Sequence, residues 1–268
     1  MSKAPRMYRA HMHLGGALER EGRVAEALES FARAAELAPD VVEVHYNRGN
    51  ALRQLGRLED AGAAYQRSLG LNPAFAPSVL NLAALYRDAG RLGDAERLLR
   101  ASRSELPESA ELFRRLGLVY RDQGRLAEAE EALRRAVELG PDRAAAHYSL
   151  ANLHLEQGDH EAAVRHYLGA IARRHDYVEA RNNLGLLYLR QGAYDRAFQV
   201  FTGGLRLVPE ASILYYGLAG AQAGLGRPQA AVTSYRRFLQ GGSVDPKVAA
   251  AVRERIQKLQ QAAPEDTQ

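Results

Sequence analysis

The sequence predicts an all-α solenoid, in which antiparallel helix pairs stack along one axis. A pattern returns every 34 residues from Tyr8 to Asp245 without an insertion, which gives seven copies. A fixed period of this length, with small residues at fixed positions, indicates stacked supersecondary units. The copies span 8–41, 42–75, 76–109, 110–143, 144–177, 178–211 and 212–245. Position fifteen is always glycine and position twenty always alanine: Gly22, Gly56, Gly90, Gly124, Gly158, Gly192 and Gly226, with Ala27, Ala61, Ala95, Ala129, Ala163, Ala197 and Ala231.

Each copy reads as two helices, which in the first copy are expected at Tyr8–Glu21 and about Val24–Ala38. Apolar residues recur there at helical spacing, from Leu14 to Phe31. Gly22 supplies the left-handed residue with which a helix can end. Carboxylates then fall in the first turn of the second helix, where they face the positive end of its dipole: Glu26, Asp60, Asp94, Glu128, Glu161 and Asp195.

Segments outside the copies are short. Residues 1–7 form a lead-in, and residues 246–262 are expected to form a capping helix, because Asp245 suits the N-cap and Pro246 the first turn. The predicted apolar stripe of that helix contains Val248, Val252, Ile256 and Leu259. A disordered tail is expected at 263–268.

The copies resemble the tetratricopeptide repeat family. The residues that carry the resemblance are a small residue at position eight, Ala at position twenty, Phe or Tyr at position twenty-four and Pro at position thirty-two, as in Gly49, Ala61, Tyr65 and Pro73. The resemblance implies a right-handed superhelix with a C-terminal capping helix. It also implies a concave groove lined by positions two, five, six, nine, twelve and thirteen.

Asparagine recurs at these groove positions: Asn47, Asn50, Asn81, Asn152, Asn182 and Asn183. A carboxamide both donates and accepts hydrogen bonds, so it can hold a peptide backbone whatever its sequence. The arrangement is similar to the asparagine ladder in the repeat array of O-GlcNAc transferase. The alternative is that these residues only solvate a polar surface.

Arginine recurs too, with Arg53, Arg87 and Arg121 at one position in three successive copies and Arg114 and Arg115 nearby. Such a row could bind acidic groups. Alternatively, it forms ion pairs with residues such as Asp88 and Asp122.

Some family members grip a C-terminal carboxylate with a clamp of Lys, Asn, Asn, Lys and Arg. Asn50, Asn81 and Arg115 match three of these positions, whereas Tyr46 and Glu111 stand where lysine is needed. The carboxylate clamp is therefore not the favoured interpretation.

The groove positions of the last copy are apolar. Tyr216 and Ile213 lie there, and Tyr148 is a further groove aromatic. This end could contact an apolar side chain or helix face. Alternatively, the capping helix or a second subunit covers it.

The sequence argues against several function classes. It has no cysteine, no phosphate loop, no nucleophile elbow and no HExxH motif, so we expect neither an enzyme nor a cofactor. The histidines show no metal-ligand spacing, and His11, His45 and His147 fall where core aromatics belong. The net charge of +4 and the arginine row would suit nucleic acid, but the groove charges are balanced and groove aromatics are few, which argues against it. No signal peptide or membrane span is recognisable, and a cytoplasmic location is the default expectation. Abundant Ala and Arg with three Lys favour a GC-rich bacterial source.

The resulting hypothesis is a scaffold or adaptor that binds an extended or short helical segment of another protein in the groove. The partner segment would be acidic with an apolar end. The main alternative is a structural protein that assembles with copies of itself into a homo-oligomer. A protein that binds an acidic ligand or nucleic acid is the weaker alternative.

Overall fold

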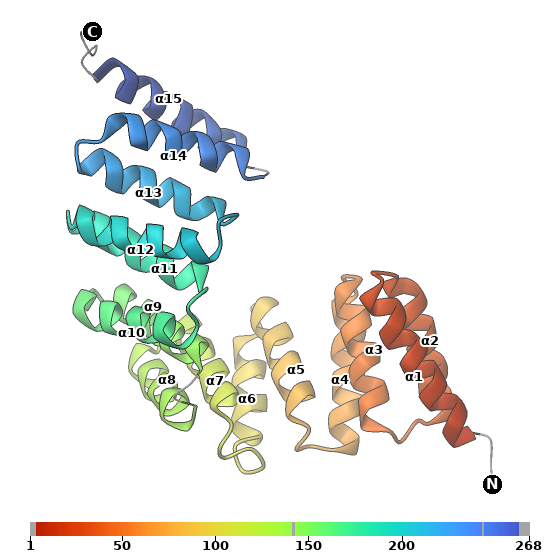
Figure 1. Ribbon diagram of the computed structural model, residues 1–268. Coiled ribbons are helices and arrows are strands. Elements are labelled where there is room, and N and C mark those ends of the chain that lie inside the picture. Colours follow the sequence, from red (N-terminus) through yellow and green to blue (C-terminus); the bar gives the residue numbers. More distant parts are fainter. Residues whose placement is uncertain (1–3, 141–142, 243, 263–268) are drawn as a thin grey trace. The chain divides into compact units, whose positions relative to one another are not determined.

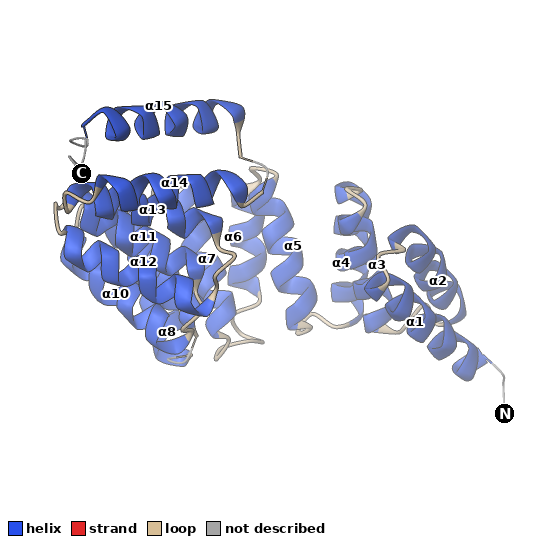
Figure 2. Cartoon of the chain, turned by 45° about the horizontal axis from the view of Figure 1, so that its top comes forward, coloured by secondary structure: helices blue, strands red, loops and turns tan. Residues whose placement is uncertain are grey.

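A computed structural model describes residues 4–140, 143–242 and 244–262. Throughout these ranges the backbone forms only helices and the loops that join them (Figure 2). The predicted tail at 263–268 lies outside the described residues, as does Pro141. In the ranges described, no helix is long and apolar enough to cross a bilayer.

The helices divide into two compact units, residues 1–139 and 140–268, in each of which consecutive helices pack side by side (Figure 1). The first unit contains α1 (Ala4–Arg20), α2 (Val24–Leu37), α3 (Val42–Gln54), α4 (Leu58–Leu71), α5 (Ala76–Asp88), α6 (Leu92–Ala101), α7 (Ala110–Asp122) and α8 (Leu126–Leu139). The second contains α9 (Ala144–Glu156), α10 (His160–Arg173), α11 (Val178–Arg190), α12 (Tyr194–Leu207), α13 (Ser212–Gly224), α14 (Pro228–Gln240) and α15 (Pro246–Ala262). The prediction of an all-α solenoid is confirmed.

Glycine ends the first helix of each pair. Gly22 and its six equivalents have φ between 70° and 80°, the left-handed region in which a Cβ would be strained. The residue after each glycine donates its N–H to a carbonyl five residues earlier, as Arg23 does to Leu18, at 2.8–2.9 Å. This double turn satisfies the last carbonyls of one helix and reverses the chain into the next.

The second helices of the first unit begin with an ion pair. In four successive pairs the arginine before the helix donates its Nε to a carboxylate three residues later, at 2.6–2.9 Å. The carboxylate also faces the helix dipole. Because most of these side chains are exposed and solvent screens their charges, each pair contributes little to stability. The pairs are Arg23–Glu26, Arg57–Asp60, Arg91–Asp94 and Arg125–Glu128.

Paired helices touch where position eight of one faces position twenty-four of the other. A Cβ added to Gly49 would lie 2.6 Å from the Tyr65 ring, and one added to Gly185 would lie 2.3 Å from Phe201. The glycine therefore lets the ring lie directly against the backbone of the first helix. The neighbouring position-twenty alanines, from Ala27 to Ala231, are all fully buried.

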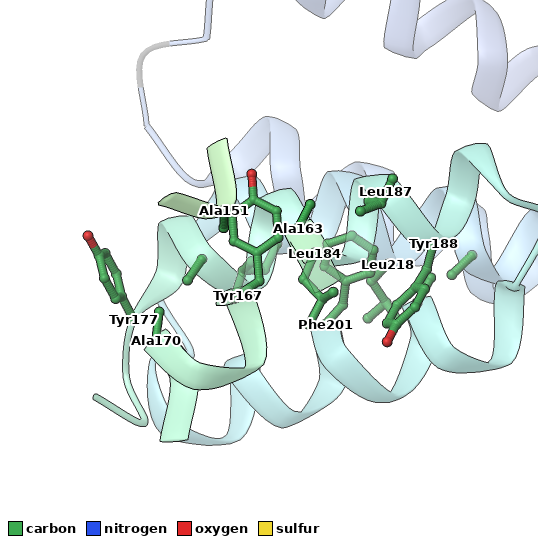
Figure 3. Packing of buried hydrophobic residues seen from close by; sticks show 14 of the residues in the cluster. Ala151, Ala163, Tyr167, Ala170, Tyr177, Leu184, Leu187, Tyr188, Phe201 and Leu218 are labelled. Carbon is green, nitrogen blue, oxygen red and sulfur yellow. The ribbon is translucent and has the colours of Figure 1, made fainter. Parts of the chain in front are cut away.

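The core of the second unit runs continuously through α9–α13. Tyr167, Leu184 and Phe201 are completely buried in it and follow one another along the stack (Figure 3). A further cluster joins α14 to α15, where Phe238 packs with Val252 and Ile256. The helix α15 thus covers the apolar side of α14.

Three details differ from the sequence-based expectation. Val248 was expected in the apolar stripe of α15 but is 42% exposed, and Ala249 is buried instead because it lies three residues before Val252 on the same face. Leu14 is 51% exposed, because equivalent residues of later pairs pack beneath a preceding helix and α1 has none among the described residues. The proline near the end of a copy was expected to end the second helix, but α6 ends at Ala101, six residues before Pro107.

The adjacent glycines of α1 test the helix–helix contact. A Cβ at Gly15 would lie 2.6 Å from Phe31, whereas one at Gly16 would meet nothing within 4 Å. We expect Gly15→Ala to destabilise the protein by about 1–3 kcal/mol through overpacking. The matched control Gly16→Ala should stabilise it by up to about 1 kcal/mol through helix propensity.

Urea denaturation followed by circular dichroism measures both changes, and hydrogen exchange of α1 and α2 localises them. Equal stabilities for the two variants would show that the ring does not constrain this position.

Candidate protein-binding surface

A carboxamide cluster links three successive helices of the first unit. The hydroxyl of Tyr65 on α4 donates to Asn50 Oδ1 on α3 at 2.7 Å. Asn81 on α5 donates its Nδ2 to the same oxygen at 2.9 Å. We call Asn50, Tyr65 and Asn81 the first carboxamide cluster. The side-chain orientation of both asparagines follows from these bonds, because one oxygen receives both donors.

The second unit contains a cluster of the same composition on α9, α10 and α11. Tyr167 donates its hydroxyl to Asn152 Oδ1 at 2.5 Å, and Asn183 Nδ2 donates to that oxygen at 3.2 Å. The Asn183 amide also lies 3.2 Å from the Tyr148 hydroxyl. Asn152, Tyr167 and Asn183 form the second carboxamide cluster.

Two aromatic rings flank each cluster. Tyr46 lies 6.1 Å from Tyr65 and 5.5 Å from Phe75, measured between ring centroids. In the second unit, Tyr148 lies 6.0 Å from Tyr167 and 5.1 Å from Tyr177. Tyr46 and Tyr148 are half-buried, and so are the four clustered asparagines, so part of each side chain remains at the surface.

The central tyrosines stay protonated at neutral pH. Burial raises the pKa of Tyr65, and burial raises the pKa of Tyr167 to about 12. Each hydroxyl is therefore a permanent hydrogen-bond donor to its asparagine.

The six predicted asparagines do not form one continuous ladder. The structure brings Asn50 to Asn81 and Asn152 to Asn183, whereas Asn47 and Asn182 are half-buried outside both clusters. Sequence reasoning named the four clustered asparagines, but it missed Tyr65 and Tyr167 as their polar partners. Their signal was present: the position that holds Phe31 or Phe201 elsewhere is tyrosine where asparagine precedes it by fifteen residues.

Ion pairs occupy most of the predicted arginine row. Asp122 on α7 receives Arg87 from α5 at 2.7 Å and Arg121 at 2.9 Å. Arg53 is exposed. The geometry thus favours the ion-pair interpretation over an open row of positive charge, and Asp122 is one of the two partners that the sequence suggested.

Glu111 binds the other two predicted arginines. Arg114 forms two bonds to it, at 2.6 and 2.8 Å, and Arg115 Nε forms a third at 3.0 Å. Burial opposes the charge of Glu111, but the two arginines outweigh this effect and hold the pKa of its carboxyl below the ordinary value. Burial also lowers the pKa of Arg115.

The apolar end predicted at Tyr216 is partly covered. Its ring lies 5.3 Å from Phe238, and Arg255 of α15 donates to its hydroxyl at 2.9 Å. Ile213 remains 41% exposed. The alternative in which the capping helix covers this end therefore holds for Tyr216.

Three histidines, His45, His147 and His154, are buried, whereas His11 is only half-buried. The Nε2 of His45 lies 2.7 Å from the Pro39 carbonyl oxygen. His147 and His154 of α9 each place their ring 5.4 Å from His166 of α10.

A cavity of about 530 Å³ lies between α7 and α8, lined by Phe113, Leu116, Tyr120 and Ala132 and by charged residues that include Arg103. Its lining includes Arg103, which follows the C-terminal end of α6 at Ala101. The Ser102 hydroxyl donates a hydrogen bond to the Leu98 carbonyl oxygen at 3.0 Å, and such a bond competes with continuation of the helix. The sequence reading did not foresee this cavity.

These observations define a class of protein, a helical-repeat scaffold with polar clusters bridging successive helices. The Tetratricopeptide repeat family matches 2–42, 42–75, 76–101, 148–211 and 202–246, and a TPR repeat matches 117–158. The chain belongs to the tetratricopeptide repeat family. No curated protein sequence matches it significantly.

Solved structures share the fold. A tetratricopeptide repeat protein from Parabacteroides merdae ATCC 43184 has a TM-score of 0.64 at 19% identity, covering 95% of this chain and 99% of its own. The APC/C hetero-tetramer Cut9–Hcn1 contains a chain with a TM-score of 0.66 at 15% identity, covering 94% and 53%. MamA from Desulfovibrio magneticus RS-1 has a TM-score of 0.56 at 24% identity, covering 66% and 98%.

The Glu111 ion pairs should make stability depend on pH. We expect Glu111→Gln to destabilise the protein by about 1–3 kcal/mol at pH 7, because two half-buried guanidinium groups lose a charged partner. The folded pKa of Glu111 lies below its unfolded value, so its contribution is complete above about pH 4.5 and is lost as the pH falls through the folded pKa.

Urea midpoints of wild type and variant should therefore converge in acid. The exposed Glu108→Gln is the control and should match wild type at every pH. A difference from wild type that persists unchanged below the folded pKa would contradict this assignment.

Proposed function

We propose that this scaffold binds an extended segment of another protein through its two carboxamide clusters and the tyrosines beside them. The family and fold support a protein-interaction scaffold in general. The narrower proposal rests on the hydrogen-bonding groups that the clusters leave over. It concerns Asn50, Asn81, Asn152 and Asn183, together with Tyr46 and Tyr148.

Internal bonds use only part of each cluster. Asn50 Oδ1 accepts two bonds and Asn81 Nδ2 donates one. Among the described residues, no hydrogen bond engages the Asn50 Nδ2 or the Asn81 Oδ1. One donor and one acceptor therefore remain, which is the complement of the C=O and N–H of a peptide unit.

Pre-organisation favours such binding. The tyrosine hydroxyl and the neighbouring asparagine fix each carboxamide before a ligand arrives, so little side-chain entropy is lost on binding. The predicted arginine row is less suited, because Glu111 pairs with Arg114 and Arg115, and Asp122 pairs with Arg87 and Arg121. We therefore expect the bound segment to be uncharged where it meets the clusters.

Selection from a phage library of random linear peptides tests the proposal. A peptide selected on wild type is synthesised, and its affinity is measured by fluorescence polarisation. The double variant Asn81→Ala, Asn183→Ala should bind it about tenfold more weakly, because each site loses a hydrogen bond worth about 0.5–1.5 kcal/mol.

Gln199→Ala on α12 is the matched control, since this exposed carboxamide lies outside both clusters. Circular dichroism must show the same helical content for all variants. Recovery of no peptide, or equal affinity for wild type and the double variant, would contradict the proposal.

A further inference from the structure

The two carboxamide clusters and their flanking rings are the same set of residues at a fixed offset. Every member of the second set lies 102 residues beyond its counterpart, which is three 34-residue periods. Four of the five are identical and the fifth exchanges one aromatic ring for another. The counterparts are Tyr46 and Tyr148, Asn50 and Asn152, Tyr65 and Tyr167, Phe75 and Tyr177, and Asn81 and Asn183.

The set does not recur at the intervening period. One period after Tyr46, Asn50 and Tyr65 the sequence has Leu80, Ala84 and Leu99. Two periods after them it has Arg114, Leu118 and Leu133. The repetition is therefore not a general property of the 34-residue pattern.

The geometry repeats with the sequence. The tyrosine hydroxyl reaches the first asparagine at 2.7 Å in one cluster and 2.5 Å in the other. The distance between the paired asparagines is 2.9 Å and 3.2 Å, and the flanking tyrosine lies 6.1 Å and 6.0 Å from the central one. Each set lies entirely within one unit, so neither depends on how the units are placed.

Helix stacking alone does not require these polar residues. Phe201 stands at the position of Tyr65 and Tyr167, and Gly217 stands at the position of Asn81 and Asn183. A Cβ added to Gly217 would lie 2.2 Å from the Phe201 ring. An aromatic ring against glycine thus joins successive pairs without a half-buried polar group. Because a polar group that is removed from water carries a desolvation cost, its recurrence at two equivalent places points to a ligand.

Besides the exchange of Phe75 for Tyr177, the two sets differ in two contacts. Asn183 Nδ2 donates to the Tyr148 hydroxyl at 3.2 Å, and the second set has a cation near the Tyr177 ring. The Arg174 guanidinium lies 3.3 Å from the centre of the Tyr177 ring, whereas its counterpart near Phe75 is Asn72. We therefore assign ligand contact to Tyr46 and Tyr148, with Phe75 and Tyr177 as the rings that support them. Neither set contains a charged member, which favours an aliphatic or proline side chain next to the bound peptide unit.

We propose that the chain has two equivalent subsites, one in each unit, that bind two copies of the same short uncharged motif. Each subsite takes one backbone peptide unit on its asparagine pair and one compact apolar side chain on Tyr46 or Tyr148. This inference rests on the proposed function. It adds the number of sites, their equivalence and the chemistry of the motif.

Isothermal titration calorimetry with the peptide selected on wild type tests the stoichiometry. Wild type should bind two peptides per chain with one apparent affinity. Asn81→Ala and Asn183→Ala should each leave one strong site of unchanged affinity, and the double variant should leave none. Gln199→Ala should behave as wild type.

A measurement without substitutions covers the case in which a variant fails to fold. In a titration followed by nuclear magnetic resonance, the side-chain amides of Asn50 and Asn152 should shift together, with half-saturation at the same peptide concentration within about twofold. Amides that shift in one cluster only would overturn the two-site inference.

The outcomes separate the two proposals. If one peptide binds per chain and substitution in only one cluster abolishes this binding, the two subsites are not equivalent, but the proposal of peptide binding stands. Two peptides per chain that are insensitive to both asparagine variants overturn both proposals, as does the absence of binding.

Discussion

The structure depends on how closely the two helices of a pair approach. A ring such as Tyr65 or Phe201 lies against a glycine of the partner helix, where even a methyl group would overlap it. This contact sets the spacing within the pair and buries the ring completely. The left-handed glycines between the two helices reverse the chain tightly enough for this ring–glycine contact to form, so the turn and the contact act together.

The same ring position connects packing to the candidate site. Phenylalanine there contributes only burial, whereas tyrosine extends a hydroxyl past the core to the asparagine of the first helix. The same asparagine also accepts a hydrogen bond from an asparagine of the next helix pair. Its side chain therefore links successive helix pairs and fixes the orientation of the surface carboxamides. Recognition groups are thereby held by the core itself and not by a mobile loop.

Much of the fold could be predicted from the sequence because it rests on local chemistry. The glycine turns, the helix starts and the second helix at Val24 follow from residue type and period. The site was less predictable. The family resemblance placed Asn50 and Asn81 among the groove positions, but the bond between them joins residues in different copies and depends on side-chain direction. Asp122 was named as a partner of the arginine row, but its pairing with Arg87 also joins two copies and was not specified. Exposure of Val248 depends on which face α15 turns to α14.

The early end of α6 has a consequence for cooperativity. In a repeat array, the free energy of unfolding is approximately the sum of the stability of each repeat and the interaction energy between neighbouring repeats. Cooperative unfolding therefore requires strong interaction at every interface between repeats. The connection Ser102–Ser109 is twice as long as Ala38–Val41, and the turn lost from α6 removes packing surface against α7. Among the steps between helix pairs of the first unit, coupling is therefore weakest at α6–α7. Partly unfolded states of this unit should divide there, with the helices on either side folding as separate blocks.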